Sequence, residues 1–382
     1  MPRKSPAVRL IERPGRFFED FRLDEVIRHA TPRTLTEGDA SLYTALTGCR
    51  HALWSSQPLA RDLGLRARPL HDLLVFNTAF GKTVPDISLN AVANLGYAEV
   101  RFLAPVYPGD TLRCESVVIG LRPNSNGRSG VVYVRSTAYR DDDAAVLSWV
   151  RWVMVHRRQP QPPMAPGASG SEHVPRLAGH VPVDRLALPD APRPGPALDD
   201  WCEATGSQAL WEDYAMGDRI LHPGGVTVEE ADHMTATRLY QNTARVHFDG
   251  HGMAGSPMGR RLVYGGHVIS VCHALSYDGL ENVLGIAAIN AGSHVAPTLA
   301  GDTLYAVTEV LDRWKLPGRA DVGALRLRML GLKNLHPAHL PGLREPAADT
   351  AHDTPLAQHP AVVLDLDYTV LMPRRPGARA DA

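Results

Sequence analysis

Phe102-Leu-Ala-Pro-Val-Tyr-Pro-Gly-Asp-Thr-Leu112 returns later in the chain as His294-Val-Ala-Pro-Thr-Leu-Ala-Gly-Asp-Thr-Leu304. The two stretches lie 192 residues apart, and almost the same offset relates Phe18-Glu-Asp-Phe21 to Trp211-Glu-Asp-Tyr214. An offset that stays constant over so long a span indicates two copies of one domain fused in tandem. Each copy can therefore be compared with the other, position by position, to separate scaffold from site.

The composition fits two globular domains without a nucleic-acid or membrane partner. The chain has 382 residues, of which 44% are hydrophobic, and a formal net charge of −1, whereas nucleic-acid-binding domains usually carry a basic face. It has no run of 18 apolar residues, so we expect no membrane span, and its first residues do not look like a signal peptide. Four isolated cysteines without metal or disulfide spacing suit a reduced, cytoplasmic protein.

The repeat and the proline content divide the chain into two domains and a linker. We expect copy one to span 15–158 and copy two to span 201–375. The segment 159–200 begins Gln159-Pro-Gln-Pro-Pro, a composition that favours extended chain over a packed core, so it is predicted to be a linker. Copy two has about 25 extra residues near its end, and we expect them to form a loop within 336–360.

The hydrophobic periodicity predicts the same α+β architecture in each copy. In copy two, helices are expected at 227–240, with Thr227 as N-cap, and at 266–278, where apolar residues recur with helical spacing. Strands are predicted at 287–295, 302–312, 319–332 and 362–372, and in copy one at 131–139 and 146–155. Each copy is therefore expected to be a long helix wrapped by an antiparallel sheet.

These features together resemble the MaoC-type dehydratase family, whose fold is the hot dog. The resemblance lies in a helix start of the type Thr/Val-x-x-Asp, a loop that ends in histidine, a helix that opens with glycine, and a strand entered through Pro-x-x-x-Gly-Asp-Thr-Leu. It covers both copies, so it implies a tandem double hot dog. Within the family, Asn90-Ala-Val-Ala-Asn-Leu-Gly-Tyr-Ala-Glu99 and Gln241-Asn-Thr-Ala-Arg-Val-His-Phe248 resemble the mesaconyl-CoA hydratases. That branch implies an acyl-CoA thioester substrate, with no metal and no cofactor other than the CoA of the substrate.

The family's catalytic motif, Asp-x-Asn-Pro-x-His, points to copy two. The matching segment runs from Asn242 to His247, so the histidine and the spacing are kept while the aspartate is replaced by asparagine. Copy one has Cys49 and Trp54 at these positions. We therefore predict that copy two is catalytic and that copy one accommodates the acyl-CoA.

The catalytic residues predicted from this motif are His247 and Asn242. Histidine can transfer a proton near neutral pH, whereas an amide has no proton that titrates there and can only position a water or the imidazole. A carboxylate such as Asp249 or Asp232 could supply the missing acid or base. The sequence does not choose between them.

Two further groups of residues are predicted to contact the thioester and the free carboxylate of such a substrate. Gly265 and Gly266 open the second helix of copy two, where backbone N–H groups can stabilise an enolate oxygen. A carboxylate would be met by an arginine fork, for which Arg245, Arg260 and Arg261 are the candidates. Cys49 and His51 are not interpreted as a pair, because residues so close in sequence rarely face the same point.

Three functions remain open from the sequence. The first is a hydro-lyase that hydrates mesaconyl-CoA, and the second is an acyl-CoA thioesterase, since hot-dog folds also support that reaction. The third is a non-catalytic acyl-CoA-binding protein, which the loss of the aspartate would suit. Because two hot dogs already pair within one chain, a monomer and a homodimer are both compatible with the sequence.

Overall fold

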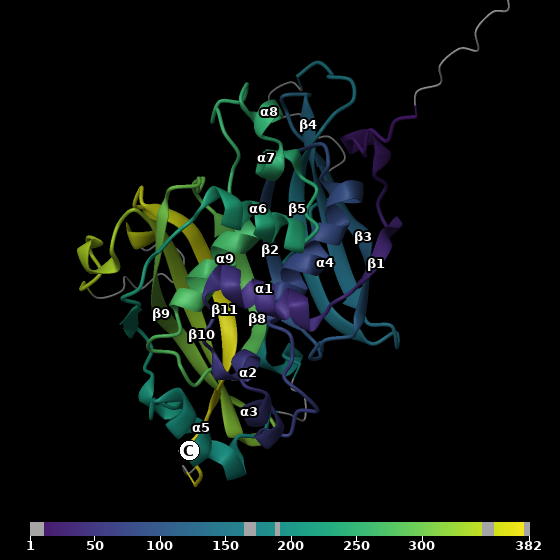
Figure 1. The fold of residues 1–382 in the computed structure, drawn as a ribbon. Helices are drawn as coiled ribbons and strands as arrows, with labels where there is room; N and C mark the ends of the chain where they lie inside the picture. Colours follow the sequence, from purple (N-terminus) through teal and green to yellow (C-terminus); the bar gives the residue numbers. More distant parts are fainter. Residues whose placement is uncertain (1–10, 164–172, 188–191, 346–354, 378–382) are drawn as a thin grey trace, which may run out of the picture.

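The strands of both copies form one continuous antiparallel sheet. The computed structural model describes residues 11–163, 173–187, 192–345 and 355–377 (Figure 1). In these residues the sheet has 11 strands in the order β1-β3-β4-β5-β2-β8-β11-β10-β9-β6, and β7 pairs with β9. The helices lie on one face of this sheet, with α4 and α9 near its middle (Figure 1).

The two copies contribute matching sets of elements. Copy one supplies η1 (Phe18–Asp20), β1 (Val26–Thr34), α1 (Glu37–Thr47), α2 (Ala52–Ser55), α3 (Gln57–Asp62), α4 (Asp72–Ile87), β2 (Ala91–Phe102), β3 (Thr111–Pro123), β4 (Ser129–Tyr139) and β5 (Ala145–His156). The connection contains η2 (Val183–Arg185), η3 (Gly195–Ala197) and α5 (Leu198–Thr205). Copy two supplies η4 (Trp211–Asp213), β6 (Arg219–Leu221), β7 (Val226–Thr227), α6 (Glu230–Leu239), α7 (Arg245–Phe248), α8 (Gly250–Met253), α9 (Gly265–Leu275), β8 (Gly285–His294), β9 (Thr303–Leu316), β10 (Arg319–Lys333), η5 (Pro337–His339), η6 (Pro355–Gln358) and β11 (Val362–Pro373).

The copies meet where β2 pairs with β8, and this junction makes the molecule a double hot dog. Tyr97 of β2 lies opposite Gly292 of β8, and α4 packs against α9 above the junction. Thirteen of the 16 residues of α4 are buried, because this helix is covered by the sheet, by α9 and by loops. The predicted α+β double hot dog is confirmed.

The repeated stretch, 102–112 in copy one and 294–304 in copy two, contains a turn that leads into a strand in each copy. Gly109 and Gly301 adopt φ angles of 99° and 94°, a region in which glycine alone avoids a steric cost. The carboxylates of Asp110 and Asp302 each accept a hydrogen bond from the backbone N–H three residues earlier, at 2.8 and 2.9 Å. The shared residues therefore build scaffold.

Most of the predicted strands are confirmed to within a few residues, and one predicted helix start is wrong. The helix expected from Thr227 begins at Glu230, with Glu229 as its N-cap. Thr227 instead ends the short strand β7, and its hydroxyl lies 2.8 Å from that of Thr303 on β9. The pairing with β9 holds this segment extended, so tertiary contact overrides the local capping signal.

The predicted linker is partly packed. Residues 164–172 and 188–191 lie outside the described part of the chain, but His173 forms a β-bridge with Leu121. The side chain of Val181 is 2% exposed, and its N–H donates to Oδ1 of Asn290 at 2.9 Å. The proline-rich composition gave no sign of this contact with both copies. In the predicted insertion loop, the described residues include η5 and η6, and 346–354 lie outside the description.

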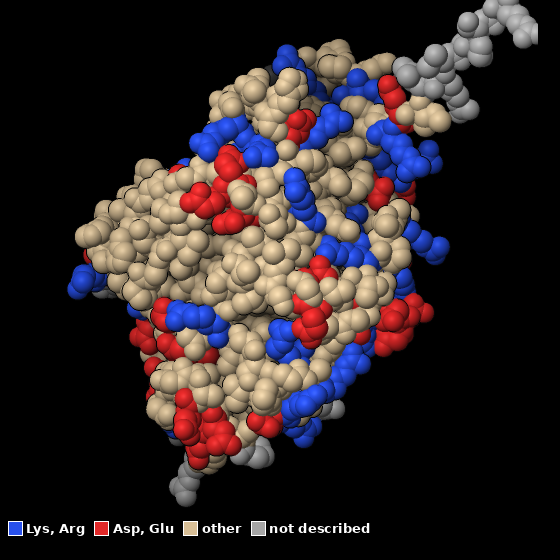
Figure 2. All heavy atoms as spheres, viewed as in Figure 1, with Lys and Arg blue, Asp and Glu red and all other residues tan. Residues whose placement is uncertain are grey.

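The surface carries charges of both signs, and the helices are short. Lys and Arg side chains are interspersed with Asp and Glu over the face shown in Figure 2, as the net charge of −1 suggests. Within the described ranges, none of the helices is both long and apolar enough to cross a membrane. The four cysteines are buried and unpaired.

Candidate active site

The N-terminus of α9 offers two backbone N–H groups to a ligand. Tyr264 is the N-cap residue, and its side chain makes no capping hydrogen bond. Among the hydrogen bonds of the described residues, none uses the N–H of Gly265 or Gly266. The first N–H groups of a helix have no partner within the helix and carry its positive dipole. This N-terminus can therefore stabilise a negative charge.

Glycine is required at both positions by the side chains around them. A Cβ on Gly265 would lie 2.3 Å from Nε2 of His294. A Cβ on Gly266 would lie 2.0 Å from Oδ1 of Asn77, which belongs to α4 of copy one. The same asparagine donates through Nδ2 to the carbonyl of Gly266 at 3.1 Å. Copy one thus fixes the first turn of the helix that carries the site in copy two.

His247 lies beside this helix start with one ring nitrogen left for chemistry. Its ring centroid is 5.4 Å from that of Tyr264, and its Nδ1 lies 3.1 Å from the carbonyl oxygen of Leu262. Since a carbonyl only accepts, Nδ1 carries the proton and Nε2 keeps its lone pair. The side chain remains partly exposed, while desolvation by the surrounding protein lowers its pKa to about 4. His247 is therefore a neutral base at neutral pH.

Asn242 shapes the loop that leads to His247. Its side chain is 5% exposed, and its Oδ1 accepts a hydrogen bond from the N–H of Ala244 at 3.0 Å, which closes an Asx turn. The preceding Gln241 has a φ of 53°. No hydrogen bond joins Asn242 to His247 within the described part of the chain. Direct participation of Asn242 in the reaction stays a prediction, whereas its part in the turn is observed.

The two aspartates considered as substitutes for the family acid lie elsewhere. Asp249 is the N-cap of α8 and accepts a hydrogen bond from the N–H of Gly252 at 2.8 Å. Asp232 is exposed in the first turn of α6. Neither forms an ion pair or hydrogen bond with His247 among the described contacts, so the structure gives no support to a simple Asp–His dyad.

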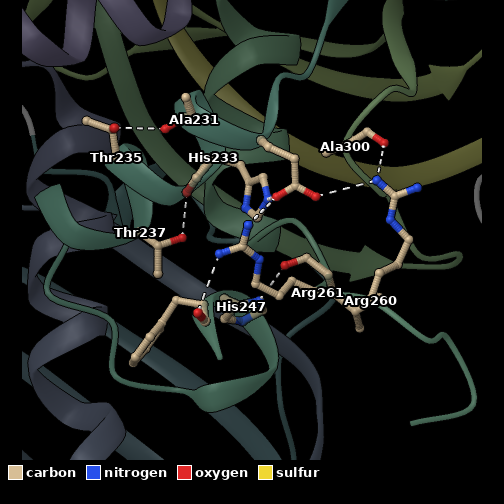
Figure 3. Close-up of polar contacts among 11 residues, drawn as sticks. Ala231, His233, Thr235, Thr237, His247, Arg260, Arg261 and Ala300 are labelled. Atoms are coloured by element: carbon tan, nitrogen blue, oxygen red, sulfur yellow. Dashed lines mark hydrogen bonds and ion pairs between the residues drawn. The ribbon is translucent and has the colours of Figure 1, made fainter. Parts of the chain in front are cut away.

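The three predicted carboxylate-binding arginines divide into one free and two engaged side chains. Arg260 and Arg261 reach from their loop toward the same glutamate on α6 (Figure 3). That residue, Glu230, forms ion pairs with both, and Arg260 also donates to the carbonyl of Ala300 at 2.7 Å. Arg245 is exposed on α7. Arg261 thus lies near His247 (Figure 3), but its guanidinium forms an ion pair with Glu230.

His294, which borders Gly265, and Tyr97, which contacts His294, were not predicted as site residues from the sequence. His294 is the last residue of β8, is exposed, and lies 3.5 Å from the hydroxyl of Tyr97 through Nε2. Desolvation and the nearby His247 lower the pKa of His294 to about 4. The repeat could have indicated His294, because copy one has Phe102 at the equivalent position.

Copy one closes the corresponding helix start. The N-cap residue of α4 is His71, whose Nδ1 accepts a hydrogen bond from the N–H of Leu73 at 3.1 Å. Trp54, which replaces the histidine, packs on His71 with ring centroids 3.9 Å apart. Asp72 occupies the position of Gly265, and its carboxylate accepts from the N–H of Ile286 at 2.9 Å. The α4 start therefore has a side-chain cap on the N–H of Leu73 and a tryptophan in place of the accessible histidine of copy two.

Comparisons with known proteins agree over nearly the whole chain. The family model described as mesaconyl-CoA hydratase matches residues 9–344. The β-methylmalyl-CoA dehydratase of Chloroflexus aurantiacus is 54% identical over 362 residues, covering 95% of this chain and 98% of that protein. The mesaconyl-CoA hydratase of Cereibacter sphaeroides is 52% identical over 363 residues, covering 94% of this chain and 98% of that protein.

Solved structures give the same fold. A MaoC domain dehydratase from Chloroflexus aurantiacus superposes with a TM-score of 0.86 at 52% identity, covering 96% of this chain and 100% of that chain. A Mycobacterium tuberculosis protein with a double hot-dog fold gives a TM-score of 0.70 at 26% identity, covering 95% of this chain and 100% of that chain.

Proposed function

Because the chain belongs to the mesaconyl-CoA hydratase family, we propose that it catalyses the reversible hydration of mesaconyl-CoA to β-methylmalyl-CoA. The observation that supports this most strongly is the α9 start of copy two. It combines uncapped N–H groups at Gly265 and Gly266 with a partly exposed neutral base, His247. In copy one the N–H of Leu73 is capped by His71 and Trp54 stands in place of the histidine.

The N-terminus of α9 suits the charge that develops during hydration. Water adds to C3 of the enoyl thioester, and the electron pair of the double bond moves toward the thioester oxygen as an enolate. Two N–H groups at a helix N-terminus stabilise such an oxyanion without having to reorganise. The absence of side chains at Gly265 and Gly266 lets the thioester approach the backbone.

His247 is assigned the proton transfer. Nε2 accepts a proton from the attacking water while Nδ1–H stays on the carbonyl of Leu262. In a syn addition the new C–O and C–H bonds form on one face, so the proton taken by His247 can return to C2 and collapse the enolate. One histidine then serves as base and acid in turn, which accounts for catalysis without the family aspartate.

His294 and Tyr97 are assigned a positioning role. Burial raises the pKa of the Tyr97 hydroxyl well above its usual range, so the hydroxyl stays protonated and can donate to Nε2 of His294. This contact orients the imidazole that borders Gly265. Asn242 contributes by shaping the loop before His247.

The proposed reaction requires no metal and no cofactor beyond the CoA of the substrate. A cytoplasmic location is a proposal that rests on the cysteine usage, and the pairing of two hot dogs within one chain is compatible both with a monomer and with a homodimer. Neither affects the assignment of the site to copy two.

The test is to incubate the purified chain with mesaconyl-CoA and to follow both the enoyl absorbance and free thiol. Hydration predicts loss of absorbance, formation of β-methylmalyl-CoA and no release of CoA, and the reverse reaction from β-methylmalyl-CoA. Release of free CoA would instead identify a thioesterase. No change in either signal would leave only a binding function and would overturn the proposal.

A further inference from the structure

Copy one contains a buried arginine that has no polar partner among the residues that the structure describes. Arg151 on β5 is 0% exposed, and its Nε, Nη1 and Nη2 atoms make no hydrogen bond. Burying an unpaired charge is costly, and desolvation lowers the pKa of this guanidinium to about 9. Apart from the ring of Phe80, the described residues offer this group no compensating partner.

Arg151 lies in a row of side chains that leads to the candidate active site. It pairs in register with Tyr97 of β2, and Tyr97 pairs with Gly292 of β8. The missing side chain of Gly292 leaves room for the Tyr97 ring, which a Cβ there would approach to 2.1 Å. The row then continues to His294, whose Nε2 is 3.5 Å from the Tyr97 hydroxyl.

A second set of contacts links Arg151 to the start of α9. Its guanidinium carbon lies 4.4 Å from the centroid of the Phe80 ring, and Phe80 lies 6.2 Å from Tyr264 between ring centroids. Burial raises the pKa of the Tyr264 hydroxyl well above its usual range, and the nearby Arg151 opposes that rise. The arginine is thus adjacent to the residue that immediately precedes Gly265.

The fold itself does not require a cation at this position. By the alignment of the two copies, the residue of β11 that corresponds to Arg151 is Tyr368, which lies opposite Ile289 on β8. Tyr368 contacts His273, the counterpart of Phe80, with ring centroids 6.2 Å apart. An aromatic residue therefore fills the same place in copy two, and the arginine is a special feature of the half that faces the site.

We propose that Arg151 binds the free carboxylate of a dicarboxylic acyl-CoA and thereby selects it over monocarboxylic acyl-CoA thioesters. The proposal rests on the proposed function, because it takes the thioester to be held at Gly265 and Gly266. A four-carbon enoyl chain is short, so its carboxylate must end close to the helix start, where Arg151 lies and Arg245 is exposed. The guanidinium fork suits a carboxylate in its plane.

Access to Arg151 requires a side chain to move. The guanidinium nitrogens are closed off from solvent, and the ring of Phe80 covers the group. A ring offsets part of the charge, but it accepts no N–H···O hydrogen bond. The carboxylate of the substrate takes the place of the ring and pairs with the fork, which couples recognition of the second carboxylate to placement of the thioester.

The kinetic test compares two substrates that differ in the carboxylate alone. Tiglyl-CoA has a methyl group where mesaconyl-CoA has its carboxylate. For Arg151→Met, kcat/KM with mesaconyl-CoA is expected to fall about 100-fold, as for loss of one partner of a buried charge pair, while kcat/KM with tiglyl-CoA stays unchanged or rises. Equal losses with both substrates would show a structural role and overturn the proposal. The control is Tyr368→Phe, which removes a polar group from the equivalent position of copy two.

A binding test separates this proposal from the proposed function. Methylsuccinyl-CoA and 2-methylbutyryl-CoA are saturated, cannot be hydrated, and differ in the same carboxylate. Wild-type protein is expected to prefer methylsuccinyl-CoA, and Arg151→Met to lose that preference. If wild-type protein failed to hydrate mesaconyl-CoA, the proposed function would fall, and this preference would still decide the role of Arg151. No preference in the wild type, or an unchanged preference in the variant, overturns it.

Further variants and a melting-temperature measurement distinguish a loss of carboxylate binding from a folding defect. Arg151→Lys keeps the charge but not the fork, so it should retain a reduced preference. The melting temperature of Arg151→Met should stay the same or rise, because an unpaired buried charge is removed, whereas a structural arginine would lower it. Loss of the preference in Arg260→Gln or Arg261→Gln, with Arg151→Met unaffected, would assign the carboxylate to those surface arginines instead.

Discussion

The starts of α4 and α9 occupy equivalent places in the two copies, yet only one is open. At α4, the side chain of His71 caps the first turn and Trp54 packs on that imidazole. At α9, the side chain of Tyr264 provides no cap, and the ring centroid of His247 lies 5.4 Å from that of Tyr264. The same scaffold therefore carries a capped helix start in one copy and the candidate active site in the other, through a few substitutions around a helix N-terminus.

The closed copy also serves the open one. Asn77 of α4 holds the first turn of α9 through its contact with the carbonyl of Gly266, and Tyr97 of β2 reaches His294 across the junction. Residues of copy one thus form part of the wall of the site in copy two. A duplicated domain that has lost its own site can in this way become part of the other.

The largest effect is expected when the candidate site in copy two loses its histidine, which copy one also lacks. Replacing His247 by alanine removes the proposed base, and general acid–base catalysis typically contributes 10²–10⁴-fold, so kcat/KM for mesaconyl-CoA should fall about 1,000-fold. The melting temperature should change little, because the side chain is partly exposed. Steady-state kinetics with His247→Ala and with the copy-one counterpart Trp54→Phe measure the difference.

Only the change in copy two should abolish turnover. An unchanged rate for His247→Ala, or an equal loss in Trp54→Phe, would contradict the assignment of catalysis to one copy. The pH profile gives a further check. Because the pKa of His247 is lowered to about 4, the active neutral form persists from pH 8 to about 6, and kcat/KM should decline only as the pH approaches that value.

Much of the fold could be predicted from the repeat and from strand alternation. The shared Gly-Asp turn made the duplication visible, and both copies use it in the same way before β3 and β9. The start of α6 could not be predicted, because Thr227 is drawn into pairing with β9. The contacts of the linker with both copies were likewise invisible, since they join residues far apart in the chain.

The site was predictable only where it lies in one segment. His247 and the glycines belong to recognisable motifs, whereas Tyr97, His294 and Arg151 converge through pairing of β5, β2 and β8. The pair that was not expected, Cys49 and His51, does meet, with Sγ 3.6 Å from Nδ1. Their contact forms where the short helix α2 starts, and it lies in the closed copy.

A smaller but still large effect is expected when the α9 start is made bulkier. A Cβ on Gly265 would lie 2.3 Å from Nε2 of His294, so Gly265→Ala displaces either the imidazole or the helix turn. Loss of one oxyanion donor typically costs 10²–10³-fold in kcat, and we expect a decrease of about 100-fold. The control is Gly255→Ala, because a Cβ there would meet nothing within 4 Å. Equal activity of the two variants would remove Gly265 from the site.

The smallest effect concerns stability in acid. It tests the buried histidine cluster at the start of α4, to which α9 contributes His273. His273 of α9 stacks on His51 with ring centroids 4.7 Å apart and lies 5.3 Å from His71. Desolvation and the charge of His222 lower the pKa of His273 to about 3. Below its ordinary pKa of 6.5 the unfolded chain binds a proton that the folded chain excludes, so the free energy of unfolding falls as the pH drops from about 6.5 toward 3.

The variant His273→Phe, which copies Phe80 of the other copy, removes this contribution. Between pH 7 and pH 5 the free energy of unfolding of the wild-type protein should drop by about 2 kcal/mol more than that of the variant, since each pKa unit corresponds to about 1.4 kcal/mol. Urea unfolding at a series of pH values measures the slope, which is insensitive to any constant cost of the substitution itself. Parallel pH curves for the two proteins would show that His273 takes up its proton without unfolding, and that the histidine cluster at the closed helix start is hydrated rather than dry.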